Sequence, residues 1–186
     1  MGRVSQAQAE ENRRRVVDTA SRLFREQGTQ VSVADLMKAA GLTHGAFYKQ
    51  FASKEALVDE ATAHAFAELA RRHSTGLERH DGQREAAQQE LIDTYLSAEH
   101  RDDPADGCPV AALATDIARE GGAREARRVY AEGVADFADF LATDDQDGIV
   151  RLCTLFGALV LSRATHGSPL ADEILAAAHA ALTETG

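Results

Sequence analysis

A chain of 186 residues with 44% apolar side chains is long enough for one or two small globular domains and is not typical of a disordered protein. Alanine is abundant, proline occurs only 3 times and tryptophan is absent, which predicts an all-α fold because alanine favours helices and proline breaks them. The polar N-terminus lacks the apolar core of a signal peptide, and no stretch is long and apolar enough to span a bilayer. We therefore expect a cytoplasmic protein without membrane contact.

The net charge of −10 argues against a nucleic-acid partner until its distribution is considered. Residues 1–55 carry a net charge of +3, whereas residues 56–186 carry −13. All three lysines, Lys38, Lys49 and Lys54, lie in the first segment. This asymmetry predicts a small basic head on an acidic body, as in proteins whose head binds nucleic acid. The alternative is chance, because the excess over 55 residues is modest.

Apolar residues between positions 16 and 24 recur at helical spacing, which predicts a first helix over Gln8–Glu26 that ends at Gly28. Arg13–Arg15, near its start, form either a solvated face or an arm that reaches DNA phosphates. Three residues suited to N-cap positions then divide the next segment. The expected helices are Val33–Ala40, His44–Phe51 and Lys54 to about His73, with Ser32, Thr43 and Ser53 as their caps.

The second and third of these helices are separated by only three residues, and Gly41 permits the sharp turn of a helix-turn-helix unit. The apolar side chains that can pack the unit are Leu36, Ala40, Leu42, Phe47 and Phe51. The side chains left exposed would be Thr43, His44, Gly45, Tyr48, Lys49 and Gln50. Hydroxyl, imidazole, amine and amide groups are the chemistry that proteins use on phosphates and base edges. The segment therefore predicts binding to double-stranded DNA.

Residues 40–57 read A-G-L-T-x-G-x-F-Y-x-x-F-x-S-K-E-x-L, and R-L-F at 22–24 is followed by Gly28. This pattern is similar to the DNA-binding domain of TetR-family regulators over about residues 13–60. The resemblance implies an N-terminal helix-turn-helix domain at residues 8–60 and a helical effector-binding and dimerisation domain at residues 61–186. It also implies a regulator that is not an enzyme and needs no cofactor or metal. A small enzyme of unknown chemistry is the rival class.

The resemblance also implies roles for residues of the head. Ser32 and Thr43 would contact phosphates at helix N-termini, where backbone N–H groups favour anions. Tyr48 and Lys54 would contact phosphates as well. His44 and Gly45 would face the major groove, and Lys49 and Gln50 would reach phosphate or base. Many members carry lysine where this chain has His44, which leaves the base preference open.

The remaining chain predicts five more helices, joined by turn-rich stretches that include Gly121 and Gly122. They are expected at Gln83–Glu99, Val110–Arg119, Ala123–Leu141, Gln146–Thr165 and Pro169–Thr183. Ile149–Ser162 is apolar almost all round, so its helix should be buried on several faces, with Cys153 as inert core. The resemblance implies that the last two helices form a four-helix bundle with those of a second copy, with Leu155 and Leu159 at the interface. The alternative is a purely internal core.

The resemblance also implies a mostly apolar pocket for a small-molecule effector between the helices of about residues 83–165, whose ligand would move the fourth helix and release the operator DNA. The aromatic residues available for it are Tyr95, Tyr130, Phe137, Phe140 and Phe156. Because so few aromatic residues are available to line the pocket, the expected effector is small or aliphatic. A regulator without a ligand and an activator are alternatives.

Cys108 lies in Asp-Gly-Cys-Pro at the expected start of a helix, a position that lowers the pKa of a thiol. This four-residue motif resembles an element of TetR-like regulators that sense electrophiles or oxidants. It supports a second hypothesis, in which Cys108 is the sensor. The alternative is an ordinary packed cysteine. The acidic stretch at residues 143–148 does not fit a calcium loop, and the seven histidines show no metal-binding spacing.

Overall fold

The computed structural model describes residues 6–119 and 124–183, and within these ranges every regular element is a helix. The elements are α1 (Gln6–Gln27), α2 (Val33–Ala39), the 3-10 helix η1 (His44–Lys49), α3 (Lys54–Arg79), α4 (Arg84–Tyr95), α5 (Ala98–Asp102), α6 (Pro109–Arg119), α7 (Arg124–Leu141), α8 (Gly148–Ala164) and α9 (Pro169–Thr183). The all-α prediction is confirmed.

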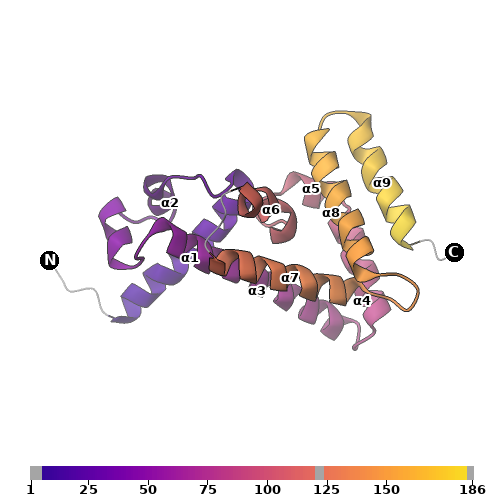
Figure 1. The fold of residues 1–186 in the computed structure, drawn as a ribbon, viewed down its shortest axis with the longest axis horizontal. Helices are drawn as coiled ribbons and strands as arrows, with labels where there is room; N and C mark the ends of the chain where they lie inside the picture. Colours follow the sequence, from indigo (N-terminus) through magenta and orange to yellow (C-terminus); the bar gives the residue numbers. More distant parts are fainter. Residues whose placement is uncertain (1–5, 120–123, 184–186) are drawn as a thin grey trace.

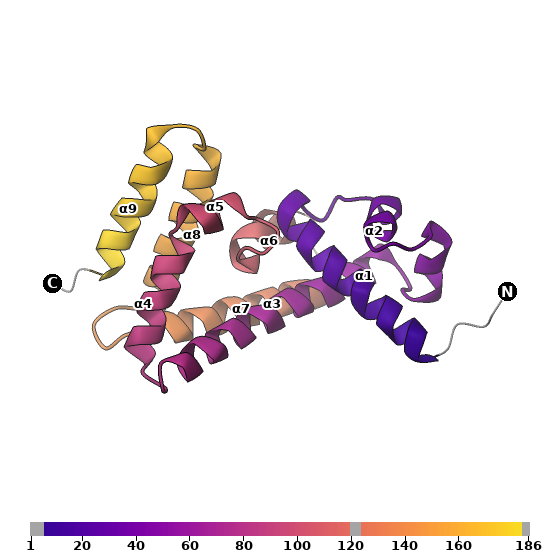
Figure 2. The same ribbon diagram turned by 180° about the vertical axis from the view of Figure 1, so that it is seen from behind.

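The helices form a small head and a larger body. α1, α2 and η1 make the head at the N-terminal end, and the long helices α3 and α7 lie side by side and lead away from it (Figure 1). At the opposite end, α4 and the hairpin of α8 and α9 complete the body, while α5 and α6 lie between this end and the head (Figure 2). α3 therefore connects the two parts as one continuous helix.

Each part has its own apolar cluster. The head cluster includes Val16, Phe24, Leu36 and Phe47, together with Leu113 of α6. The body cluster is built mainly from the following side chains: Ile92, Phe137, Leu141, Leu152, Leu155 and Leu159. Tyr130 packs against both clusters. The head is therefore not an independently packed domain, because a helix of the body contributes to its apolar core.

Several helix ends have the predicted physical cause. Ser32 accepts a hydrogen bond from the Asp35 backbone N–H at 3.1 Å, and Ser53 accepts one from Ala56 at 3.2 Å. Gly28 follows α1 with a φ of +82°, a left-handed conformation that glycine adopts without a steric penalty. These caps explain why the boundaries of the first helices could be read from the sequence.

Three predicted helices differ from the structure. The third is the 3-10 helix η1, because it has only six residues and Thr43 makes no side-chain cap bond. The predicted helix over Gln83–Glu99 is two helices, because Ser97 starts α5 by accepting a hydrogen bond from His100 at 3.1 Å. α3 continues to Arg79, since the chain first turns at Asp81 and Gly82, both at positive φ.

The prediction for the buried face of α8 was wrong in part. Leu155 and Leu159 are completely buried inside the protomer, so they are core residues and not an interface. Cys153, expected in the core, is exposed. α8 instead leaves a row of apolar side chains uncovered, including Val150, which is 63% exposed, and Leu161, which is 57% exposed.

The expected domain boundary at residue 60 lies inside α3, so the division into residues 8–60 and 61–186 stays a prediction. The predicted turn at Gly121 and Gly122 lies outside the described residues. Among the residues that the structure describes, no helix combines the length and the apolar character needed to cross a bilayer.

The turn from α7 to α8 predicts the effect of one substitution. A Cβ atom at Gly148 would lie 1.9 Å from the Ala138 carbonyl oxygen, and backbone atoms cannot move aside cheaply. We expect Gly148→Ala to lower the free energy of unfolding by about 2 kcal/mol or more. Gly76→Ala is the matched control: no atom lies within 4 Å of its Cβ position in α3, so it should be neutral or stabilise by about 0.5–1 kcal/mol. Urea unfolding curves measure both, and equal stability of the two variants would contradict this account.

Candidate functional site

Arg13 fixes the geometry of the head. From α1 it donates hydrogen bonds to the Gln50 carbonyl oxygen and to the Glu60 carboxylate, and its guanidinium lies 4.3 Å from the Phe51 ring centre. These contacts tie α1 to the end of η1 and to the start of α3. Arg13 is thus engaged within the head, whereas Arg14 and Arg15, which contact Glu11 and Asn12, are exposed. Of the predicted arginine arm, only these last two face solvent.

The N-termini of α2 and η1 differ in what their hydroxyl groups do. The Ser32 hydroxyl donates to the Asp35 carboxylate at 2.6 Å, in addition to capping α2. The exposed Thr43 hydroxyl makes no cap bond, and the Thr43 carbonyl oxygen accepts from Ala46 at 2.9 Å. Thr43 therefore has the freer hydroxyl for an outside acceptor.

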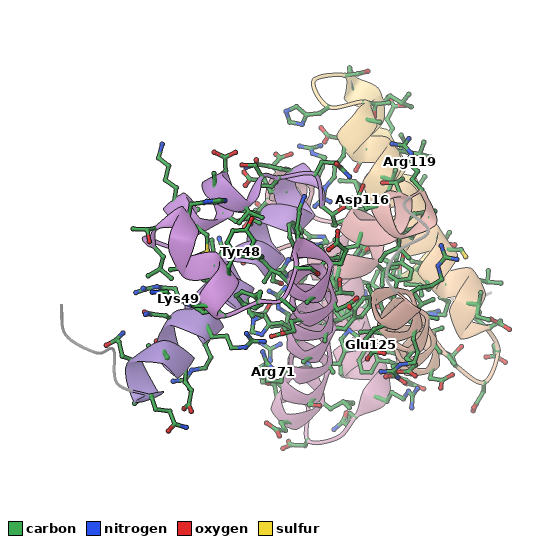
Figure 3. The ribbon with its side chains drawn as sticks, turned by 60° about the vertical axis from the view of Figure 1, so that its left-hand side comes forward. Tyr48, Lys49, Arg71, Asp116, Arg119 and Glu125 are labelled. Atoms are coloured by element: carbon green, nitrogen blue, oxygen red, sulfur yellow. The ribbon has the colours of Figure 1, made fainter. Side chains whose placement is uncertain are left out.

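The surface of η1 presents four of the predicted residues to solvent: Thr43, His44, Gly45 and Lys49. Tyr48 joins them, and it is 65% exposed, with its ring edge-on to the rings of His44 at 5.6 Å and Phe47 at 5.2 Å. No atom of the described residues lies within 4 Å of the Cβ position of Gly45, so no contact within them requires a glycine there. Figure 3 shows Tyr48 and Lys49 on this side of the head.

Two of the predicted DNA-contacting residues are less exposed to solvent than expected. Gln50 is half-buried, and its side-chain oxygen is enclosed without a hydrogen-bond partner in the described part of the chain. Lys54 is half-buried at the start of α3. The exposed surface is therefore narrower than the predicted set, and it is centred on η1.

A cavity of about 560 Å³ lies in the body between α3, α4 and α7, and His100 and Cys108 close one side of it. This volume is within the range of small-molecule sites. Its apolar walls include Leu69, Ala87, Leu91, Phe137 and Phe140. Three arginines of α3, namely Arg71, Arg72 and Arg79, also line it.

Two polar atoms on the cavity wall have no nitrogen or oxygen hydrogen-bond partner among the described residues: the Tyr95 hydroxyl, which interacts with the Cys108 thiol, and the Nε2 of His73. The His73 ring stacks on Phe140, with ring centres 4.4 Å apart and planes 9° apart, and it lies 4.7 Å from the Phe137 ring. Burial lowers the pKa of His73 to about 4, so the ring is neutral at pH 7. Sequence reasoning missed His73, although its position four residues after Leu69 places it on the inner face of α3.

Comparison with known proteins gives the same architecture. Residues 16–61 match the family model described as bacterial regulatory proteins, tetR family. The HTH-type transcriptional regulator AcrR of Shigella flexneri is 41% identical over 61 residues, which are 32% of this chain and 28% of that relative. The head of this chain therefore carries the DNA-binding domain of the TetR family. Members of this family are regulators and not enzymes.

Solved structures extend the likeness to the TetR fold as a whole. The reduced form of NemR from Escherichia coli superposes with a TM-score of 0.75 at 18% identity, over 93% of this chain and 95% of that one. A TetR transcriptional regulator from Chloroflexus aurantiacus gives 0.74 at 22% identity, over 95% and 94%. The body of this chain therefore has a TetR-type fold although its sequence has diverged.

The predicted effector residues fall into two groups. Tyr95, Cys108, Phe137 and Phe140 line the cavity. Tyr130 and Phe156 are not among the residues that line it: Tyr130 donates its hydroxyl hydrogen to the Val110 carbonyl oxygen at 2.7 Å and packs between the two cores. Phe156 packs against the body cluster on α8.

Cys108 is buried directly before α6, and burial raises the pKa of its thiol, although Tyr95 and two backbone N–H groups act in the opposite direction. The expected lowering by a helix N-terminus is thus outweighed by desolvation. A thiol of this kind is mostly protonated at pH 7.

The link between head and cavity could not be read from the sequence. Arg25 of α1 is 5% exposed and donates to the Gly107 carbonyl oxygen at 3.3 Å and to the Glu68 carboxylate at 3.2 Å. Arg22 pairs with Asp106, and Thr29 donates its backbone N–H to Asp116 at 2.6 Å. The segment that precedes α6 and carries Cys108 is therefore fastened to the last turns of α1.

One group of potential metal ligands occurs next to this link, although no metal was expected. His64 Nε2 lies 3.6 Å from a carboxylate oxygen of Asp18 and 3.7 Å from one of Glu68. The Asp18 carboxylate is exposed. We interpret the group as polar contacts between α1 and α3.

The buried His73 predicts a specific pH dependence of stability. Its pKa is about 4 in the folded protein and near 6.5 when unfolded, so its contribution is present above pH 6.5 and is lost as the pH falls toward 4. Between pH 7 and pH 5 this group should cost about 2 kcal/mol of unfolding free energy. His73→Phe removes the titrating group, so the variant should lose less stability over this interval. Urea unfolding at both pH values measures the difference, and identical losses in parent and variant would contradict the assignment.

Proposed function

We propose that this chain is a transcriptional repressor that acts in the cytoplasm, binds operator DNA as a homodimer and releases it when a small molecule occupies the body cavity. The observation that carries the DNA-binding part is the η1 surface, where exposed polar side chains surround a glycine that the protomer itself does not require. Its exposed hydroxyl, imidazole and amine groups suit phosphates and base edges.

In this proposal Thr43, Tyr48 and Lys49 contact phosphates, supported by Ser32 and Lys54 at the starts of α2 and α3. His44 and Gly45 face the bases in the major groove. Gln50, whose side-chain oxygen is enclosed, would act only if the end of η1 rearranges. The acidic body would be held away from the DNA by its own charge, which leaves the head as the surface that DNA can approach.

Dimerisation through α8 and α9 is supported by two uncovered rows of apolar side chains. On α8 the row contains Ile149, Val150, Cys153, Val160 and Leu161. On α9 it contains the exposed Leu170, Ala177 and Ala181, with the half-buried Ile174 between them. Both repeat at helical spacing, and the alanines would let a second copy approach closely. Two copies would bring two recognition helices to two half-sites.

Release of the operator follows from the link described above. A ligand that shifts the wall at Cys108 would displace Gly107, whose carbonyl oxygen holds Arg25 of α1. The head would then change its orientation relative to the body, and with it the spacing of the two recognition helices. This releases DNA only if the ligand binds the non-binding arrangement more tightly than the other.

A covalent mechanism through Cys108 is the second candidate, because the thiol lies on the cavity wall. Its raised pKa favours the non-covalent version, since the protonated thiol is a poor nucleophile. Cys153 is the more exposed thiol of the protomer, and the proposed dimer would cover it.

Because the space around Gly45 is open, we expect a substitution there to change the affinity for DNA without lowering the stability of the fold. Gly45→Ala should leave the unfolding free energy unchanged or raise it by up to about 1 kcal/mol, because alanine is the better helix former. It should weaken binding to DNA selected from a random pool by the parent protein by about tenfold or more, or about 1.4 kcal/mol, because the methyl group holds η1 away from the bases.

Electrophoretic mobility shifts at fixed salt measure this, with Gly76→Ala as the control that makes the same chemical change away from the head. Parent affinity in the Gly45→Ala protein would show that DNA does not approach at this residue.

The apolar row on α8 predicts the outcome of an added charge. Leu161→Asp alters a side chain that is 57% exposed in the protomer, so the fold should survive, whereas an unpaired carboxylate in a dry interface should raise the dimer dissociation constant by about 100-fold or more. Ala63→Asp, on the exposed side of α3, should leave the dimer intact. Analytical ultracentrifugation and circular dichroism check both; an undisturbed dimer of Leu161→Asp would place the interface elsewhere.

A further inference from the structure

The chemistry of the cavity wall narrows the class of effector, an inference that rests on the proposed function. The Tyr95 hydroxyl is buried on this wall, since the tyrosine is only 6% exposed, and it has no nitrogen or oxygen partner among the described residues. It interacts with the Cys108 thiol, and sulfur is a weak hydrogen-bond partner. The Nε2 atom of His73 is likewise enclosed and has no hydrogen-bond partner among the described residues. The rings of His73 and Tyr95 both lie beside Phe137. Buried polar groups are normally hydrogen-bonded, so two such atoms on one wall indicate a missing polar partner.

The walls around these atoms are aromatic. Phe140 and His73 stack with planes 9° apart, and the Phe137 ring packs beside His73 and Tyr95 with its plane tilted by 41° and 55°. Counting only phenylalanine and tyrosine predicted a small or aliphatic effector, but the two imidazoles of His73 and His100 enlarge the aromatic surface. Parallel and edge-on contacts of this kind favour an aromatic ring in the ligand.

The charges at the rim are unevenly engaged. Glu90 already pairs with Arg79 at 2.9 Å and with His80 at 2.7 Å, and Glu68 pairs with Arg25. Arg71 is exposed at the rim and makes no ion pair within the part of the chain that the structure describes. Arg72 donates one hydrogen bond to the Asp106 carbonyl oxygen at 2.8 Å. The rim thus offers free positive charge, while its carboxylates are neutralised by other side chains.

We propose that the cavity binds a hydroxylated aromatic carboxylic acid, with the ring against Phe137 and Phe140, the hydroxyl group at Tyr95 and His73, and the carboxylate at Arg71. The orientation follows from desolvation, because a carboxylate is costly to bury and stays at the solvated rim, whereas a neutral hydroxyl group tolerates the buried end when it is hydrogen-bonded. A cationic effector would meet three arginines at the rim.

Isothermal titration calorimetry on the full chain tests the class with four matched probes: 4-hydroxycinnamate, cinnamate, methyl 4-hydroxycinnamate and octanoate. We expect 4-hydroxycinnamate to bind best, at one per protomer. The methyl ester, which lacks the charge, and cinnamate, which lacks the hydroxyl group, should each be weaker by about three- to tenfold. Octanoate, which lacks the ring, should be weakest.

Variants of the wall assign each contact. Arg71→Gln should weaken 4-hydroxycinnamate by about three- to tenfold and leave its methyl ester unchanged. Arg119→Gln is the matched control, because Arg119 is exposed at the end of α6 and does not line the cavity (Figure 3). Tyr95→Phe should remove the preference for 4-hydroxycinnamate over cinnamate. It should change the melting temperature of the ligand-free protein little, because the hydroxyl has only the weak Cys108 thiol as a partner among the described residues.

The proposal is overturned if the ester binds as tightly as the acid, if octanoate equals the aromatic acids, or if neither 4-hydroxycinnamate nor the shorter 4-hydroxybenzoate and 4-hydroxyphenylacetate bind at millimolar concentration. Mobility shifts with the selected DNA, run on the same preparations, separate this outcome from a failure of the proposed function. DNA binding without acid binding rejects the effector class alone. Acid binding without DNA binding rejects the repressor and keeps the cavity assignment.

Discussion

The buried guanidinium of Arg25 is the constraint on which the arrangement of head and body depends. A charged group in this position must be paired, because an unpaired buried charge is very costly. Its three acceptors are the carbonyl oxygens of Ser21 and Gly107 and the carboxylate of Glu68. They belong to α1, to the segment before α6 and to α3, so one side chain specifies how three parts of the chain meet. Desolvation lowers the pKa of Arg25 and Glu68 opposes this, and the pair keeps the charge in place.

This interaction gives the cavity and the head a common boundary. Glu68 and Cys108 line the cavity, and Gly107 directly precedes that cysteine. A molecule that fills the cavity therefore touches residues one step from Arg25. Leu113 of α6 also packs in the head core. A shift of α6 would therefore act on the head both through the hydrogen bonds of Arg25 and through apolar packing. The proposed coupling needs no more distant pathway than these contacts.

The surfaces divide the proposed roles in a similar way. The head exposes polar groups on η1. The cavity holds buried polar atoms that have no nitrogen or oxygen partner within the described ranges. Helices α8 and α9 expose apolar rows. Each surface lacks something that a partner would supply: anions and base edges for the first, a polar ligand atom for the second, and apolar contact area for the third. These surfaces are the ones that the proposed function assigns to DNA, to an effector and to a second copy.

The sequence by itself determined the helical class, the family and the first helices, because these rest on local signals: caps such as Ser32 and Ser53, the left-handed Gly28, and a motif with fixed spacing. It also placed Thr43, His44 and Tyr48 on the exposed side of the head. Only the tertiary structure decided which apolar side chains of α8 face inward, because that helix is apolar almost all round and its periodicity selects no face. That is why Leu155 was expected at an interface and Cys153 in the core. The cavity wall at His73 and the pairing of Arg25 also join segments far apart in the chain, and such contacts leave no periodic signal in the sequence.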